Sequence, residues 1–116
     1  MSENVGFAGQ IAPEHISQVV EKGFKSIINN RPDMEGGPSQ PTSALIEESA
    51  RSAGLDYVYQ PVVAGQITEL DVRAFANHYN ELPKPILMFC FFSFHWKEKK
   101  GNFLLVTFLW KEKWLN

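Results

Sequence analysis

The chain has one cysteine, Cys90, among its 116 residues, and no arginine follows Arg73. A single cysteine excludes a disulfide within the chain. The longest apolar run after Cys90, FLLVTFLW, has eight residues, whereas a helix needs about 20 to cross a bilayer. The first ten residues, MSENVGFAGQ, lack both the basic segment and the apolar core of a secretory signal. We therefore expect a cytoplasmic protein without a transmembrane segment.

Motifs of several functional classes are also absent. His15, His78 and His95 lie in separate segments without metal-ligand spacing, so no metal site is predicted. No glycine-rich nucleotide loop and no nucleophile-elbow serine occurs, so no cofactor is predicted. A net charge of -2 gives no general attraction to nucleic acid. The lysines and tryptophans after residue 95 fit the solvated flank of an apolar strand better than a nucleic-acid or membrane surface.

Composition indicates one folded domain with a break after Cys90. The whole chain is 44% hydrophobic and 21% charged, as in ordinary folded proteins. Residues 1–90 hold all seven prolines and all three arginines and carry a net charge of -5. Residues 91–116 carry +3 and hold all three tryptophans and five of the nine phenylalanines. We predict a domain over 1–90 and an atypical segment over 91–116, which is either a genuine C-terminal element or the result of a reading-frame change near codon 91.

Hydrophobic spacing and turn residues predict alternating helices and strands up to Cys90. One helix begins at Pro13 and ends before Gly23, a second is capped by Thr42 or Ser43 and ends at Gly54, and a third covers residues 68–80. The predicted strands are Phe24–Asn29, Tyr57–Val62 and Ile86–Cys90. The segment NNRPDMEGGPSQP, with three prolines and two glycines, is predicted to be a long loop.

Strands that alternate with helices indicate an α/β fold with a mainly parallel sheet flanked by helices. Binding sites in such sheets form beyond the carboxyl ends of the strands. This rule brings together the NNRPD loop, the VVAGQIT loop and the segment that follows Cys90. We expect any functional site at this edge.

Several ordered motifs upstream of Cys90 carry a family resemblance. They are FAGQIAPE at 7–14, GFKSIINNRPD at 23–33, QPT at 40–42, AGLDY at 53–57, and PVVAGQIT at 61–68 followed by Asp71 and Val72. Together, over about residues 5–90, they resemble the beta-lactamase hydrolase-like protein phosphatase-like family. This is a bacterial branch of the cysteine-based, dual-specificity-phosphatase-like fold. The resemblance implies hydrolysis of phosphate monoesters, on a phosphorylated small molecule or a phosphoprotein, through a cysteinyl-phosphate at Cys90.

The segment after Cys90 departs from the pattern that this chemistry requires. A cysteine thiolate needs nearby N–H groups and cations, and the phosphoryl oxygens need a glycine-bearing loop and an arginine. The chain has instead Phe91-Phe92-Ser93-Phe94-His95-Trp96. We therefore predict that Cys90 occupies the nucleophile position but that catalysis is impaired.

Other residues at this edge of the sheet, and two other functions, are also candidates. Arg31 is a candidate anion-binding residue, with an ion pair to Glu35 as the equally weighted alternative. The segment 62–66 contains no general acid, and Asp33 and Asp71 fit a turn and a helix cap. Two further functions fit a strand-end cysteine on this scaffold, namely a rhodanese-like sulfurtransferase and a non-catalytic pseudophosphatase that binds a partner. The sequence does not indicate an oligomeric state.

Overall fold

The structure is a computed structural model that describes residues 4–63, 68–89, 94–99 and 102–107. Side chains are described for 4–63 and 68–89. Cys90, to which the sequence assigns the nucleophile position, lies outside the described residues. Among the described residues, no helix combines the length and the apolar character that spanning a membrane requires.

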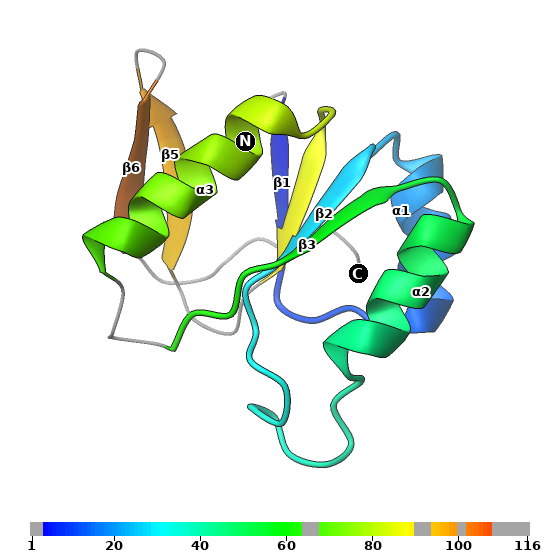
Figure 1. Cartoon of the computed structure of the whole chain (residues 1–116). Helices are drawn as coiled ribbons and strands as arrows, with labels where there is room; N and C mark the ends of the chain where they lie inside the picture. The colour runs from blue at the N-terminus through cyan, green and yellow to red at the C-terminus, as the bar shows by residue number, and fades with distance from the viewer. Residues whose placement is uncertain (1–3, 64–67, 90–93, 100–101, 108–116) are drawn as a thin grey trace.

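A four-stranded parallel sheet forms the centre of the molecule (Figure 1). Its strands are β1 (Val5–Ala8), β2 (Ser26–Asn29), β3 (Asp56–Tyr59) and β4 (Ile86–Phe89). They lie in the order β1-β4-β2-β3, so the strand of this sheet that comes last in the sequence lies between the first two. The parallel α/β fold predicted from the sequence is therefore confirmed.

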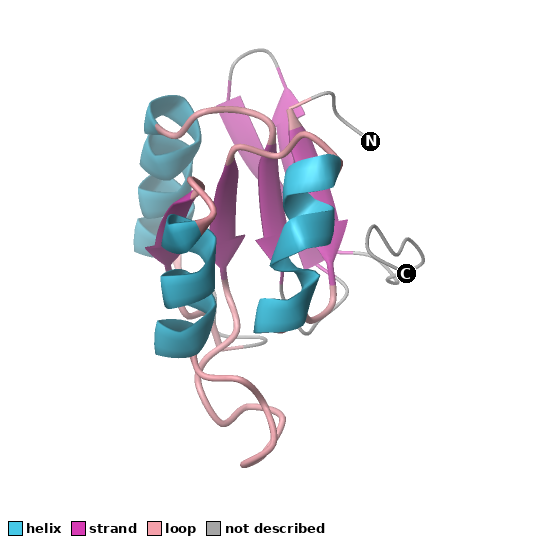
Figure 2. Ribbon diagram, turned by 90° about the vertical axis from the view of Figure 1, so that its right-hand side faces the viewer, coloured by secondary structure: helices cyan, strands magenta, loops and turns pink. Residues whose placement is uncertain are grey.

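Helices cover both faces of the sheet, as Figures 1 and 2 show. The short 3-10 turn η1 (Pro13–His15) leads into α1 (Ile16–Glu21), which lies with α2 (Ser43–Ser52) on one face. Helix α3 (Glu69–Glu81) covers the other face. Because each helix joins two parallel strands, the elements form three layers of helix, sheet and helix.

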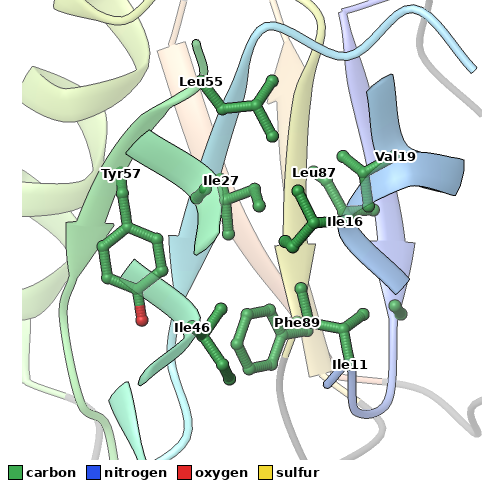
Figure 3. Packing of buried hydrophobic residues seen from close by; sticks show 11 residues of the cluster. Ile11, Ile16, Val19, Ile27, Ile46, Leu55, Tyr57, Leu87 and Phe89 are labelled. Atoms are coloured by element: carbon green, nitrogen blue, oxygen red, sulfur yellow. The ribbon is translucent and has the colours of Figure 1, made fainter. Parts of the chain in front are cut away.

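Each face of the sheet buries its own apolar cluster. Under α1 and α2, Phe89 packs between Ile11 and Ile46 at the end of the sheet where the strands finish (Figure 3). Under α3, Phe75 and Tyr79 pack on strand residues that include Met88. All four residues of β4 are buried. This burial on both sides explains the unbroken apolar run ILMF, which is typical of a central parallel strand.

Local signals explain where the helices begin and end. The side chain of Thr68 accepts a hydrogen bond from Asp71 N–H, and the Asp71 carboxylate accepts one from Thr68 N–H, at 3.2 and 3.0 Å. This capping box starts α3, as predicted. Thr42 caps α2 in the same way, by accepting from Leu45 N–H. Gly54 follows α2 with φ of +86°, a conformation that glycine adopts without strain.

The sequence prediction missed strand β1 and strand β5. Strand β1 is short and has Gly6 at its second position, so it gave no alternating pattern. An antiparallel pair, β5 (Phe94–Lys99) and β6 (Asn102–Thr107), forms a separate two-stranded sheet, and β6 contacts α3. The first five residues of the apolar run FLLVTFLW belong to β6.

Candidate functional site

The carboxyl ends of the four strands lie side by side, which places several loops at one edge of the sheet. In register, Phe89 at the end of β4 lies between Ala8 of β1 and Asn29 of β2, and Asn29 lies beside Tyr59 of β3. The long loop that follows β2 projects from this same edge (Figure 2). The residue that follows Phe89 is Cys90. The chain therefore leaves β4 between the ends of β1 and β2, at the centre of this edge.

Asn30 connects the ends of strands β2, β3 and β4. Its backbone N–H donates to Phe89 C=O at 2.9 Å, and its own C=O accepts from Val62 N–H at 3.0 Å. Its side-chain Nδ2 donates to Gln60 C=O at 2.9 Å. With 1% of its surface exposed, Asn30 is almost completely buried. This residue fixes the backbone on both sides of β2 where the strands end.

A buried network of polar side chains lies below the edge, at the start of α2. Asn29 Nδ2 donates to the Tyr57 hydroxyl at 2.9 Å, and that hydroxyl shares a second hydrogen bond with Ser43 Oγ at 2.8 Å. Burial raises the pKa of the Tyr57 phenol, and the hydrogen bonds to Ser43 and Asn29 lower it by less. Tyr57 therefore stays neutral, and the network ties β2, β3 and α2 together.

Arg31 is buried at the edge and is already engaged. Its Nε lies 3.0 Å from Glu35 Oε1, in an ion pair whose side chains are only 7% and 17% exposed. Its Nη1 donates to Gly9 C=O at 3.4 Å, and its backbone N–H donates to Asn29 Oδ1 at 2.8 Å. The ion pair with Glu35 that the sequence offered as the alternative role of Arg31 is present. The guanidinium thus joins the loop after β1 to the loop after β2.

Side chains also hold the long loop in one conformation. Asp33 Oδ1 accepts from Ser43 N–H at 2.8 Å, and Asp33 N–H donates to the Tyr59 hydroxyl at 2.9 Å. Gln40 bridges the loop by accepting from Gly36 N–H at 2.7 Å and by donating to Pro32 C=O at 3.0 Å. The Asp33 carboxylate therefore serves the first turn of α2. Within the described ranges, no three His, Cys, Asp or Glu side chains gather as metal ligands.

Comparison with known proteins shows the family to which the chain belongs. The model of the family described as "Beta-lactamase hydrolase-like protein, phosphatase-like domain" matches residues 1–95. The chain belongs to this family. The resemblance found in the sequence motifs is therefore confirmed.

Two curated relatives carry the name beta-lactamase hydrolase-like protein. The one from Agrobacterium fabrum (strain C58) is 39% identical and the one from Xylella fastidiosa (strain Temecula1) is 34% identical, each over 90 residues. Each alignment covers 78% of this chain but 21% of the relative. The phosphatase-like chain thus spans about a fifth of the length of the curated relatives it matches.

Solved structures share the fold. A "putative phosphatase" from Neisseria meningitidis is 33% identical with a TM-score of 0.72, over 78% of this chain and 63% of that one. A "putative phosphatase" from Shewanella putrefaciens is 26% identical with a TM-score of 0.63, over 77% of this chain and 57% of that one. The chain therefore shares its fold with structures described as putative phosphatases.

The sequence predicted the edge of the sheet but missed most of the polar side chains that organise it. Arg31 was singled out and does lie at this edge, whereas Asn29, Asn30, Ser43 and Tyr57 were not. One signal was available, because two consecutive asparagines end the apolar run SIINN. Asparagine is rare in a buried strand, so a pair at a strand end indicates a specific hydrogen-bonding role.

Proposed function

We propose that this chain is a phosphatase-like domain that does not transfer phosphoryl groups and that acts by binding a partner. The supporting observation is the sequence Phe91 to Trp96, which contains neither glycine nor arginine. It follows Cys90, the residue that directly continues β4 from the centre of the carboxyl edge. The chain upstream of Cys90 matches the phosphatase-like family, while the segment that would have to bind the phosphate lacks the necessary groups.

The chemistry explains why these residue types matter. Phosphoryl transfer needs a thiolate, whose pKa must fall below the ordinary value of about 8.5 through backbone N–H groups and nearby cations. The transferred group carries its charge on three oxygens, which consecutive N–H groups and a guanidinium stabilise. Phe91 and Phe92 supply bulky apolar side chains instead. His95 and Trp96 do not supply the planar fork of five donors that an arginine provides.

Arg31 does not replace the missing arginine in this proposal. Its Nε is paired with Glu35 and its Nη1 with Gly9 C=O, so a phosphate that displaced Glu35 would break this ion pair. Removing one partner of a largely buried ion pair is costly, because the other charge remains without compensation. We therefore assign Arg31 the task of joining two loops of the edge and not the binding of substrate.

The test is an assay of the purified chain with p-nitrophenyl phosphate, beside Cys90→Ser and an active tyrosine phosphatase. We expect no release of nitrophenol above buffer from either form of this chain. The rate of alkylation by iodoacetamide, followed against pH, should report a thiol pKa that is not lowered below about 8.5. Turnover that disappears in Cys90→Ser would contradict the proposal. Transfer of sulfur from thiosulfate to cyanide, also dependent on Cys90, would favour the rhodanese-like alternative.

We further propose that the break in composition after Cys90 reflects a changed reading frame. The family model matches residues 1–95, and the composition changes after Cys90 from a net charge of -5 to one of +3. Translating the other two frames of the coding DNA beyond codon 90 tests this directly. A continuation with glycine and arginine in one of those frames is expected. Its absence from both would make residues 91–116 a genuine element of the domain.

A further inference from the structure

Strand β3 lies at an edge of the parallel sheet, and among the described strands it pairs with β2 alone. The N–H groups of Asp56 and Gln60 donate to carbonyls of the neighbouring segment 25–29, at 3.1 and 2.9 Å, so both groups face β2. The backbone groups of successive residues in a strand point to opposite sides. The N–H and C=O groups of Tyr57 and Tyr59 therefore face away from the sheet, and we call them the outer edge of β3.

A side chain from α2 occupies one of the two acceptors of this outer edge. Arg51, in the last turn of α2, donates from Nη2 to Tyr57 C=O at 3.1 Å. Its Nε forms an ion pair with Glu47 Oε2, one helical turn earlier, at 2.8 Å. Within residues 4–63 and 68–89, no hydrogen bond reaches Tyr57 N–H or either backbone group of Tyr59. Unpaired backbone groups at the edge of a sheet are a template for a further strand.

The donors and acceptors of the outer edge are self-complementary. When β3 of a second copy lies antiparallel to β3 with the two Val58 residues opposite each other, Tyr57 of each copy lies opposite Tyr59 of the other. Residues that face each other in this way exchange two hydrogen bonds, so every group of both outer edges is paired. A two-fold axis relates the copies, as in most homodimers.

The neighbouring residues permit this pairing and limit its length. The same register sets Asp56 opposite Gln60, so no like charges face each other. The next outward position is Pro61, which has no N–H to donate. Because the ladder ends there, the interface is small and the association weak. Two of its acceptors are Tyr57 C=O groups, so the hydrogen bond from Arg51 competes directly with the pairing.

We propose that the outer edge of β3 is a pairing site for the same edge of a second copy, and that Arg51 prevents this pairing in the native chain. Glu47 positions the guanidinium at the edge through the ion pair. The side chains of this pair are 55% and 42% exposed, so a second chain can reach them. The proposal concerns β3 and α2 and is independent of the proposed loss of phosphoryl transfer.

Sedimentation velocity of the native chain, Arg51→Ala and Arg73→Ala tests the role of Arg51. Arg73 is the matched control, because it forms the same i,i+4 ion pair on α3, with Glu69 at 2.7 Å, away from β3. A hydrogen bond from a charged donor corresponds to a factor of about ten or more in an equilibrium constant. We therefore expect Arg51→Ala to dimerise at least about tenfold more tightly than the native chain, and Arg73→Ala to behave like the native chain. Association through any other surface would contribute equally in all three proteins.

Amide hydrogen exchange locates the contact between the copies. At a concentration where Arg51→Ala is dimeric, the N–H groups of Tyr57 and Tyr59 should exchange at least about tenfold more slowly than in dilute solution. The N–H groups of Asp56 and Gln60 should change less, because they are already bonded within the sheet.

A pair of substitutions at Tyr59 removes one donor of the outer edge. Added to Arg51→Ala, Tyr59→Pro removes the outward N–H but leaves the bonds to β2, whereas Tyr59→Ala removes the same side chain and keeps the N–H. Tyr59→Pro should dimerise at least about tenfold more weakly than Tyr59→Ala, because the two-fold axis doubles the loss of each hydrogen bond.

Several results would overturn the proposal. They are an Arg51→Ala variant that associates no more than Arg73→Ala, a dimer in which the amides of Tyr57 and Tyr59 gain no protection, and equal dimerisation of the two Tyr59 variants. A native chain that already dimerises with these amides protected would show that Arg51 does not prevent the pairing. If Tyr59→Pro does not fold, the exchange measurement on Arg51→Ala decides, since it needs no change in β3. Turnover that depends on Cys90 would contradict the proposed function alone.

Discussion

Removing the Tyr57 hydroxyl tests whether the buried network below the edge stabilises the domain. In Tyr57→Phe the ring still fills its place, since Tyr57 is only 4% exposed, but Asn29 Nδ2 and Ser43 Oγ each lose a partner. An unsatisfied buried amide donor costs about 1–3 kcal/mol, and the second lost bond adds to this. We expect the free energy of unfolding to fall by about 2–3 kcal/mol. That is a large share of the roughly 5–15 kcal/mol that holds a domain of this size together.

The effect of Tyr57→Phe on stability should also depend on pH. Because burial raises the pKa of Tyr57 above its ordinary value near 10, the folded state holds the phenolic proton more tightly than the unfolded state does. The contribution of neutral Tyr57 is therefore complete below about pH 10 and is lost as the pH rises through the folded pKa. The stability difference between wild type and Tyr57→Phe should shrink between pH 7 and pH 11.

Urea unfolding at these two pH values measures the effect, and Tyr59→Phe is the matched control. Tyr59 is 38% exposed and its hydroxyl accepts one hydrogen bond, from Asp33 N–H. Its loss should cost about 1 kcal/mol or less. If Tyr57→Phe is no more destabilising than Tyr59→Phe, or if its effect does not change above pH 10, the reasoning about the buried network is refuted.

Two further substitutions test the packing and the capping described above. In Gly6→Ala, the new Cβ would lie 2.5 Å from Phe24 Cζ, so we expect a loss of about 1–3 kcal/mol in urea unfolding, which Phe24→Leu should partly reverse. Gly9→Ala, whose Cβ would meet nothing within 4 Å, should change stability by less than about 0.5 kcal/mol, and an equal effect of both glycine variants would contradict the steric argument. Thr68→Ala removes the cap of α3 and should cost about 1 kcal/mol. An unchanged urea midpoint would show that the capping box is not needed.

Much of the fold could be predicted because its signals are local. The capping box at Thr68 and the glycine at 54 set helix ends within a few residues of chain, and the run ILMF has the composition of a buried strand. Strand β1 could not be predicted, because a four-residue strand with Gly6 has no distinguishing pattern and forms only through pairing with β4, about 80 residues away. The predicted strand 57–62 ends at Tyr59 in the structure, three residues early, since Pro61 cannot donate to a neighbouring strand.

The candidate site was predictable in position but not in detail. The rule that sites lie beyond the carboxyl ends of parallel strands predicted a site at this edge, which is where the structure places Arg31. Whether Arg31 pairs with an anion or with Glu35 depends on the conformation of the loop after β2. The hydrogen bonds of Gln40 and Asp33 hold that loop in place. The network of Asn29 and Tyr57 joins residues 28 positions apart, which no local pattern reports.

The strand order has a consequence for synthesis of the chain on the ribosome. Because β4 separates β1 from β2, strand β1 has no partner in the sheet until residues after Ile86 have been made. Parallel pairing between strands that are far apart in the sequence forms late and slowly during folding. A nascent chain that stops before Ile86 therefore leaves β1 unpaired. Translation past Phe89 supplies the last strand of the parallel sheet, so β1 can pair only once this central strand has been made.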